Sequence, residues 1–189
     1  MQNGVFSDFE LKQIGFKFKS ATEYKSVPCV GACEEEMETK VITKLCRGVV
    51  VKKIVKGTGN GTLKITCHMP WDVYTQGYGM DLDTLIDGVK AYGRNSIHEG
   101  FGLVMDIEDE DGAEKLKAYP NCVIAAGVTR KIENGAEEVA QIELEVSTMP
   151  DEYGNGMYEA LVEELADEDV KGAWMTAFTP DLVQKVATA

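Results

Sequence analysis

The chain has 189 residues, of which 44% are hydrophobic and 27% charged, a globular composition with enough apolar residues for one domain and its core. Lysine and arginine total 19 against 32 aspartate and glutamate residues, so the net charge of −13 should repel nucleic acid and anionic membranes. No apolar run reaches the roughly 18 residues of a membrane span, and the first residues lack a secretory signal, so we expect synthesis in a cytoplasm.

The N-terminal half predicts a strand, a long connection and a hairpin. Phe16 and Phe18 alternate with lysines, which is typical of a strand. Residues 20–47 fit no compact element, and a connection of that length in a small domain is usually functional. Asn60-Gly61 stands between the alternating segments 49–56 and 62–69 and predicts a hairpin turn there. The glycine-rich stretch around this pair lacks the G-K-[ST] ending of a phosphate-binding loop.

The C-terminal half predicts one helix and two further hairpins. Residues 70–79 begin with a proline suited to a first helical turn, so they predict a short helix. A DEDG turn joins strands over 102–108 and 113–120, and Asn134-Gly135 joins 121–132 to 139–147. Residues 157–165 fit either a second helix or a strand. We therefore expect a mainly β fold, an antiparallel β-sandwich or β-barrel with one short flanking helix, a long inter-strand loop and extended terminal arms.

The domain boundary is predicted near residue 165. Residues 1–165, with the long loop 20–47, should form one β-sandwich domain, and residues 166–189 a C-terminal arm. Trp174, Phe178 and Leu182 lie at loose spacing in this last segment, after an acidic ADED. Since a lone domain has little reason to end in exposed aromatic residues, we expect these three side chains to contact a neighbouring subunit.

Five cysteines, an odd number at irregular spacing, argue against a disulfide framework. Cys29, Cys33, Cys67 and His68 could supply four zinc ligands, but neither pair has the C-x2-C spacing of common zinc sites. Aligning Gly112 with the central glycine of a calcium loop leaves the first and last ligands missing. We therefore expect buried thiols in a reducing compartment, with no metal and no other cofactor.

Glu143 and Glu145 form a carboxylate pair on a predicted strand. In the segment QIELEVS the apolar residues alternate with these two glutamates, which would lie roughly 6.5–7 Å apart on one face. Glycosidases use such separations, yet they need one carboxyl group in a dry setting, and the same-face neighbours here are polar. No G-x-S-x-G occurs, and His68 and His98 read as a surface and a loop histidine. The sequence predicts no catalytic residue and a protein that is not an enzyme.

The whole pattern resembles the major tail tube proteins of tailed bacteriophages, in the form common in phages of Gram-positive bacteria. The residues that carry the resemblance are GTLKITCHMP, MDLDTLIDGVKAYG, YPNCVIAAGVTRKIENGAEEVAQIELEVSTMPDEYGNGMY and AWMTAFTPDLV. The resemblance implies a structural virion protein, located in the virion tail and made in the host bacterial cytoplasm. It implies homo-hexameric rings stacked into a hollow tube through which double-stranded DNA passes without specific binding. The implied partners are the tape measure and tail terminator proteins, and a sheath protein where the tail is contractile.

The resemblance also assigns roles to segments of the chain. Residues 20–47 match in position the loop that reaches an adjacent ring, and the N-terminal residues and the Trp174 segment would be further arms. Each subunit would add a sheet to the inner wall, and our hypothesis is that Glu143 and Glu145 face the lumen, where acidic side chains repel DNA. Two alternatives stay open: a non-catalytic β-sandwich binding or decoration module, and the tube subunit of a phage-tail-like bacteriocin.

Overall fold

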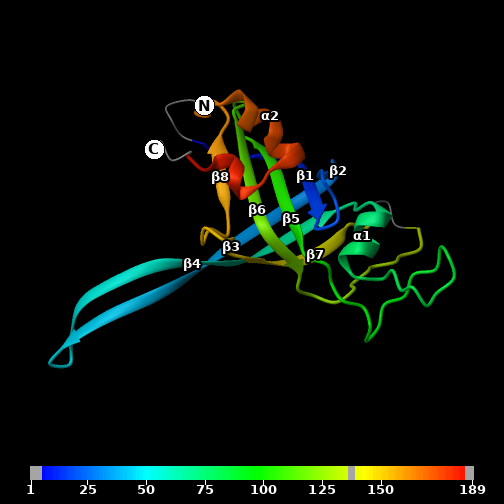
Figure 1. The fold of residues 1–189 in the computed structure, drawn as a ribbon, viewed down its shortest axis with the longest axis horizontal. Helices are drawn as coiled ribbons and strands as arrows, with labels where there is room; N and C mark the ends of the chain where they lie inside the picture. The colour runs from blue at the N-terminus through cyan, green and yellow to red at the C-terminus, as the bar shows by residue number, and fades with distance from the viewer. Residues whose placement is uncertain (1–5, 136–138, 186–189) are drawn as a thin grey trace.

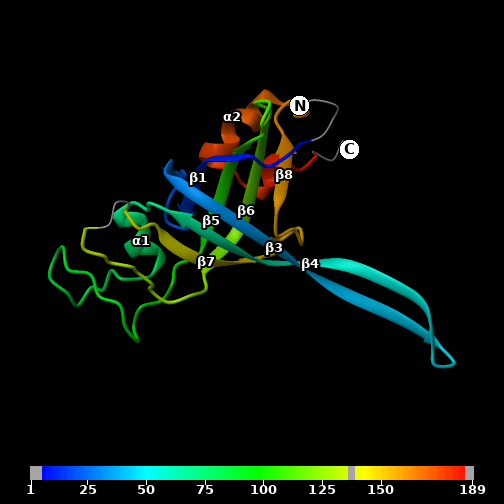
Figure 2. The ribbon, with the colours of Figure 1, turned by 180° about the vertical axis from the view of Figure 1, so that it is seen from behind.

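The computed structural model describes residues 6–135 and 139–185, and the described part is mainly antiparallel β-sheet with two short α-helices (Figures 1 and 2). The predicted mainly β fold class is therefore confirmed, although a second α-helix joins the single one expected. Among the described residues the elements are β1 (Glu10–Phe18), β2 (Lys25–Val27), β3 (Val30–Cys46), β4 (Val49–Cys67), α1 (Trp71–Gly77), β5 (Phe101–Glu108), β6 (Glu114–Ile124), β7 (Ile142–Met149), β8 (Tyr158–Leu161), α2 (Glu168–Ala177) and the 3-10 turn η1 (Pro180–Val183).

The strands form one hydrogen-bonded sheet in the order β2-β1-β5-β6-β7-β4-β3, with β8 added on β6. Strands β1 and β3 stand far apart in this order yet contact each other, so the sheet curls around a core. Strand β6 has two partners on one edge: residues 115–118 pair with β8 and residues 121–124 with β7. Pro120 lies between the two segments and has no backbone N–H to donate, which suits the point where the partner changes.

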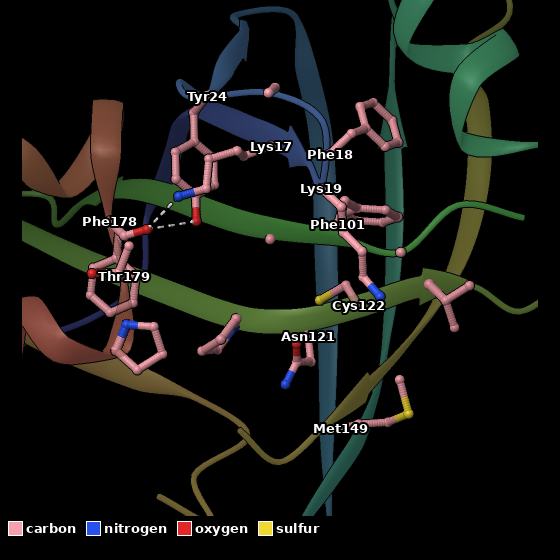
Figure 3. A pocket seen from close by; sticks show the side chains of 16 residues that line it. Lys17, Phe18, Lys19, Tyr24, Phe101, Asn121, Cys122, Met149, Phe178 and Thr179 are labelled. Carbon is pink, nitrogen blue, oxygen red and sulfur yellow. Dashed lines mark hydrogen bonds between the residues drawn. The ribbon is translucent and has the colours of Figure 1, made fainter. Parts of the chain in front are cut away.

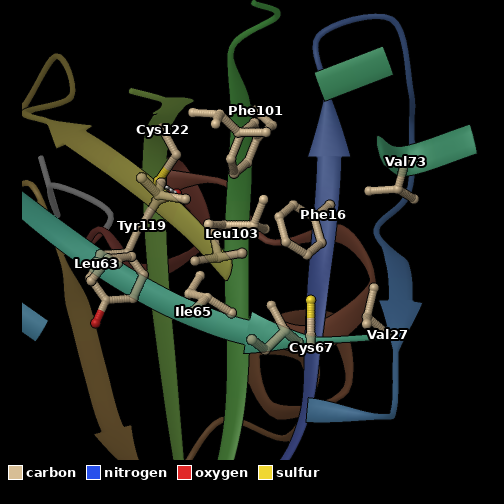
Figure 4. Close-up of a cluster of buried hydrophobic side chains, with 14 of the residues drawn as sticks. Phe16, Val27, Leu63, Ile65, Cys67, Val73, Phe101, Leu103, Tyr119 and Cys122 are labelled. Atoms are coloured by element: carbon tan, nitrogen blue, oxygen red, sulfur yellow. Dashed lines mark hydrogen bonds between the residues drawn. The ribbon is translucent and has the colours of Figure 1, made fainter. Parts of the chain in front are cut away.

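The main core lies inside the curl of the sheet, where side chains from nearly all strands meet (Figure 4). It is lined by alternate residues of each strand, as the two-residue period requires, and closed by Val73, Tyr74 and Tyr78 from around α1. The largest strand residues in it are Ile14, Phe16, Leu63, Ile65, Phe101, Leu103, Met105, Tyr119 and Leu144.

A second core lies between α2 and the outer face of β5 and β6. Val170, Trp174 and Phe178 follow one another at four-residue spacing, so they share one face of the helix and its C-terminal end. This face packs on Val104 of β5 and on Leu116 and Ala118 of β6, a single apolar cluster at one end of the molecule. The helix begins at Asp167, whose carboxylate accepts hydrogen bonds from the amides of Asp169 and Val170.

Several expectations for the strands are confirmed. Phe16 and Phe18 lie in β1, and the segments 102–108 and 113–120 form the β5–β6 hairpin. Helix α1 forms within residues 70–79. Strands β6 and β7 pair, but they stop at Ile124 and start at Ile142, so most of the predicted hairpin around Asn134-Gly135 is loop. Residues 136–138 of that loop, and the N-terminal arm over residues 1–5, lie outside the described residues.

The prediction for residues 20–67 is wrong in two respects. The segment expected to be an irregular connection, 20–47, contains the 17-residue strand β3, and no turn forms at Asn60-Gly61. Strand β4 runs through that pair for 19 residues, and the chain reverses instead at Arg47-Gly48. Both residues of this turn have positive φ, 50° and 81°, which a two-residue type I′ hairpin requires.

In the C-terminal segment one of the two open alternatives forms, together with an element that was not predicted. Residues 158–161 form strand β8 and not a helix, because the free edge of β6 accepts them in antiparallel register. Residues 168–177, for which no regular element was expected, form α2. No helix in the described ranges is both long and apolar enough to cross a membrane.

Replacing Trp174 tests the second core. Trp174 is 2% exposed and its indole N–H donates to the carbonyl of Lys117 at 3.2 Å, so Trp174→Ala leaves both a cavity and an unpaired carbonyl. We expect a loss of about 3–5 kcal/mol in the free energy of unfolding, measured by urea denaturation. The control Thr176→Ala, an exposed position on the same helix, should change it by less than about 0.5 kcal/mol. Equal losses in both variants would contradict this packing.

Candidate assembly surfaces

The most distinctive feature of the molecule is a long two-stranded ribbon that leaves the body (Figures 1 and 2). It consists of the outer parts of β3 and β4, residues 39–57, which we call the arm. Within the arm the strands pair only with each other, from Thr39 opposite Gly57 to Cys46 opposite Val49. A ribbon with no third strand and no covering helix buries little apolar surface, so it gains little stability from its own chain.

The arm is joined to the body by a bulge in β4. Three residues, 58–60, stand opposite the single Glu38, and Thr58 Oγ1 donates to the Glu38 carbonyl at 3.3 Å. Gly59 has a φ of 82°, and a Cβ there would lie 2.8 Å from Cβ of Pro150. Gly59, next to the predicted turn, therefore lets β4 bend against the 150–156 turn where the arm starts.

The arm exposes apolar side chains that no described residue covers. Val41, Leu45, Val50 and Val55 are 49%, 61%, 56% and 57% exposed, and Val49 and Val51 are exposed as well. Exposed apolar side chains gathered in this way mark an interaction site. Its position at the end of the longest axis, away from the body, makes it accessible to another molecule.

Glu143 and Glu145 lie where the alternation placed them, on the polar face of β7, opposite Thr66 and Lys64 of β4. Both glutamates are exposed, while Leu144 between them is buried in the main core. Lys64 in turn stands opposite Glu34 of β3, so carboxylates flank one lysine across three adjacent strands. No dry pocket surrounds the pair, which fits a solvated charged surface and gives no support to an acid/base site.

Trp174 and Phe178 are buried within their own chain, 2% and 1% exposed, and Leu182 is partly buried beside them in η1. The Phe178 carbonyl accepts a hydrogen bond from Lys17 Nζ at 2.8 Å, which anchors the segment on β1. A contact of these residues with another subunit stays a prediction. It requires either the remaining exposed surface of Leu182 or release of the segment from the second core.

A cavity of about 390 Å³ lies beside this anchor, between the C-terminal segment and the ends of β1, β5 and β6 (Figure 3). Its lining is mixed: Phe18 and Cys122 are apolar, and Lys17 and Lys19 bring two amines. Burial lowers the pKa of Lys17, but its ammonium is already engaged by the Phe178 carbonyl. The cavity therefore has no convergent set of free polar groups that would identify a ligand.

A partly buried ion pair ties β3 to β6 near the base of the arm. Lys117 of β6 contacts Glu35 of β3 and lies 3.6 Å from Glu159 of β8. Burial alone would lower the pKa of Lys117, but the hydrogen bond from its ammonium to Glu35 raises it overall. Lys117 therefore stays charged, and its contact with Glu35 fixes β3 against the body where the free ribbon begins.

The candidate metal and catalytic residues do not form a site. Within the described ranges no group of three or more His, Cys, Asp and Glu side chains could hold a metal ion. Cys67 is buried in the main core while Cys29 is exposed, so these two of the four residues considered as zinc ligands lie in different environments. His98 is held in its loop by the Ile124 carbonyl at 2.6 Å and the Tyr92 hydroxyl at 3.1 Å. The residues considered as catalytic or metal-binding candidates therefore do not come together in one site.

Comparisons with known proteins give no family. No protein-family model matches the chain, and no curated protein does. Among solved structures it is similar to a chain of the anti-feeding prophage (AFP) baseplate, with a TM-score of 0.49 and 13% identity, covering 87% of this chain and all of that one. It is also similar to a chain of the AFP tube-terminating cap, with a TM-score of 0.48 and 9% identity, covering 86% of this chain and all of that one.

Two glycines of β4 test how the arm joins the body. Gly59→Ala forces a side chain into a left-handed backbone position against Pro150, so the free energy of unfolding should fall by about 1–3 kcal/mol. The matched control Gly57→Ala has no atom within 4 Å of the new methyl group and no positive φ. It should be neutral or slightly stabilising in the same urea titration. Equal destabilisation by both changes would contradict the bulge.

Proposed function

We propose that the protein is a structural tail protein whose copies assemble into stacked hexameric rings, forming a hollow tail tube through which phage DNA passes. The sequence resemblance to major tail tube proteins supports this assembly. The observation that carries it in the molecule is the arm, because its exposed valines and leucine gain cover only when another molecule packs on them. Ring and tube formation supplies such a contact at every copy through heterologous interfaces.

In this proposal residues 1–165 are the tube domain and residues 166–189 a C-terminal arm, of which the described part packs on the body through α2. The arm over residues 39–57 takes the inter-ring role that the sequence assigned to the loop 20–47. The two ranges overlap in the first strand of the arm, and this part of the chain is a strand where an irregular loop was expected. Partners would be further copies of the chain and the other tail proteins, and the role would be structural.

The polar face of β7, β4 and β3 is the surface we propose for the lumen wall. It exposes Glu143, Glu145 and Glu34, and its opposite face is the buried core, so it is available to a channel without loss of packing. Repeated six times in each ring, these carboxylates would repel the phosphates of passing DNA and offer it no binding site.

Microscopy of the purified chain tests assembly directly. We expect rings or hollow tubes in negative stain at high protein concentration, because burying the apolar arm favours association. A binding or decoration module would instead give discrete monomers or small oligomers. A monodisperse monomer at all concentrations, including after addition of preformed tail fragments as seeds, would contradict the proposal.

Labelling tests the lumen assignment. In a Cys29→Ser, Cys46→Ser background, Glu145→Cys in assembled tubes should react with a small maleimide but not with a maleimide carried on a folded protein too large to enter the channel. Glu168→Cys, an exposed position at the start of α2, is the control and should react with both reagents. Equal reaction of Glu145→Cys with both reagents would place this face on the outer surface and overturn the assignment.

A further inference from the structure

The arm is basic, in contrast with the rest of the chain. Of the 19 lysine and arginine residues, six lie within residues 39–57, which contain no aspartate or glutamate. The chain outside the arm contains 13 basic and 32 acidic residues, so its net charge is −19. A segment of charge +6 on such a protein is electrostatically complementary to other copies of the same chain.

The strand register concentrates four lysines on one face of the arm. Lys40 stands opposite Lys56, and Lys44 opposite Lys52, with Ile42 and Ile54 between the two pairs. Like charges directly opposite each other on antiparallel strands destabilise a ribbon. The repulsion is relieved when carboxylates approach this face, so the free arm is poised for an acidic partner.

The other face of the arm needs an apolar partner. Val41 and Leu45 share it with Val55, and they expose about half or more of their surface. Phosphates could neutralise the lysines but would leave these side chains in water, and the arm has no aromatic residue on which bases could stack. The lysine face also exposes Ile42, paired with Ile54 between the two lysine pairs, so this face by itself favours a protein surface with both carboxylates and apolar groups.

One region of the chain has both properties at the opposite end of the long axis. It is the loop of residues 80–99, which we call the far loop and which lies beyond α1 in both views (Figures 1 and 2). Ile86 and Ile97 are 80% and 81% exposed, and Val89 and Tyr92 are also exposed. The far loop contains four acidic residues against two basic ones, and Asp83 and Asp87 are exposed beside Ile86.

The far loop is held in one conformation although it has no regular structure. The Ala91 amide donates to the Met80 carbonyl at 3.1 Å, and the Glu99 amide to the Gly77 carbonyl at 3.2 Å. Tyr92 and His98 pack against Tyr78 of the main core, which anchors the far loop on the body. An anchored loop presents its isoleucines at little entropic cost, as a docking surface requires.

We propose that the arm of one copy docks on the far loop of a second copy through its lysine face, with Lys40, Lys44, Lys52 and Lys56 facing the aspartates and Ile42 and Ile54 between them facing Ile86. The arm and the far loop lie at opposite ends of the long axis of the molecule, so the contact is head to tail and repeats indefinitely. This inference rests on the proposed assembly and names the surface that receives the arm.

Cross-linking from the native Cys46, exposed beside the arm's turn, tests the contact. Cys29→Ser removes the other exposed thiol, Cys67 and Cys122 are buried, and burial raises the pKa of Cys33 to about 11, so it reacts slowly. Thr84→Cys adds an acceptor in the far loop, and Glu163→Cys, exposed beyond β8, is the control. A short bis-maleimide should link position 46 to position 84 at least tenfold more than to position 163.

Charge reversal tests the electrostatic part of the contact. Lys44→Glu with Lys52→Glu should abolish the 46–84 link, and adding Asp83→Lys with Asp87→Lys to the same chain should restore it. Raising NaCl from about 0.05 M to about 0.5 M should lower the yield of the wild-type link about tenfold, since exposed charges are screened. A yield independent of salt and of these substitutions would overturn the charge complementarity.

The outcomes separate this inference from the proposed function. Tubes that form with the arm linked to position 163 and not to position 84 would refute the far loop as acceptor while leaving the tube intact. A strong 46–84 link in oligomers that are neither rings nor tubes would support the contact and refute the tube. Binding of duplex DNA through the lysines at about 0.15 M salt, without any 46–84 link, would overturn the inference in favour of a nucleic-acid partner.

Discussion

The arm is the constraint on which the account depends. The two strands of a ribbon hydrogen-bond to each other, but no further strand or helix packs on them to bury their side chains. Here the ribbon also carries four lysines in two directly opposed pairs on one face, and exposed Val41, Val55 and Leu45 with one lysine, Lys53, on the other. Both features are unfavourable for an isolated chain and favourable at an interface. The body beneath has the opposite character, with a buried core inside the curled sheet and a second core under α2.

Two features fix β3 and β4 on the body at the point where the arm begins. The Lys117–Glu35 pair holds β3 on the body, and the bulge at 58–60 bends β4 over the 150–156 turn. Beyond that point β3 and β4 have no other partner. The polar face of the same strands, with Glu34 and Lys64, continues onto β7 and its two glutamates. One pair of strands thus connects the surface proposed for the lumen with the surface proposed for the next ring.

Much of the fold followed from local patterns, and the failures have physical causes. Alternation located β1, β5 and β7 because each has one face on the core. It could not locate β3, whose arm half is exposed on both faces and carries no periodic signal of burial. The Asn60-Gly61 cue was misleading because the same residues suit a bulge as well as a turn, while Arg47-Gly48 forms the actual turn. The four-residue spacing of Val170, Trp174 and Phe178 did contain the signal for α2, together with the capping Asp167.

The most direct test is a cryo-EM reconstruction of the assembled protein. The account predicts hexameric rings in which each arm contacts a copy in the next ring and Glu143 and Glu145 point into the channel. Arms that extend into solvent, or glutamates on the outer surface of the assembly, would contradict it.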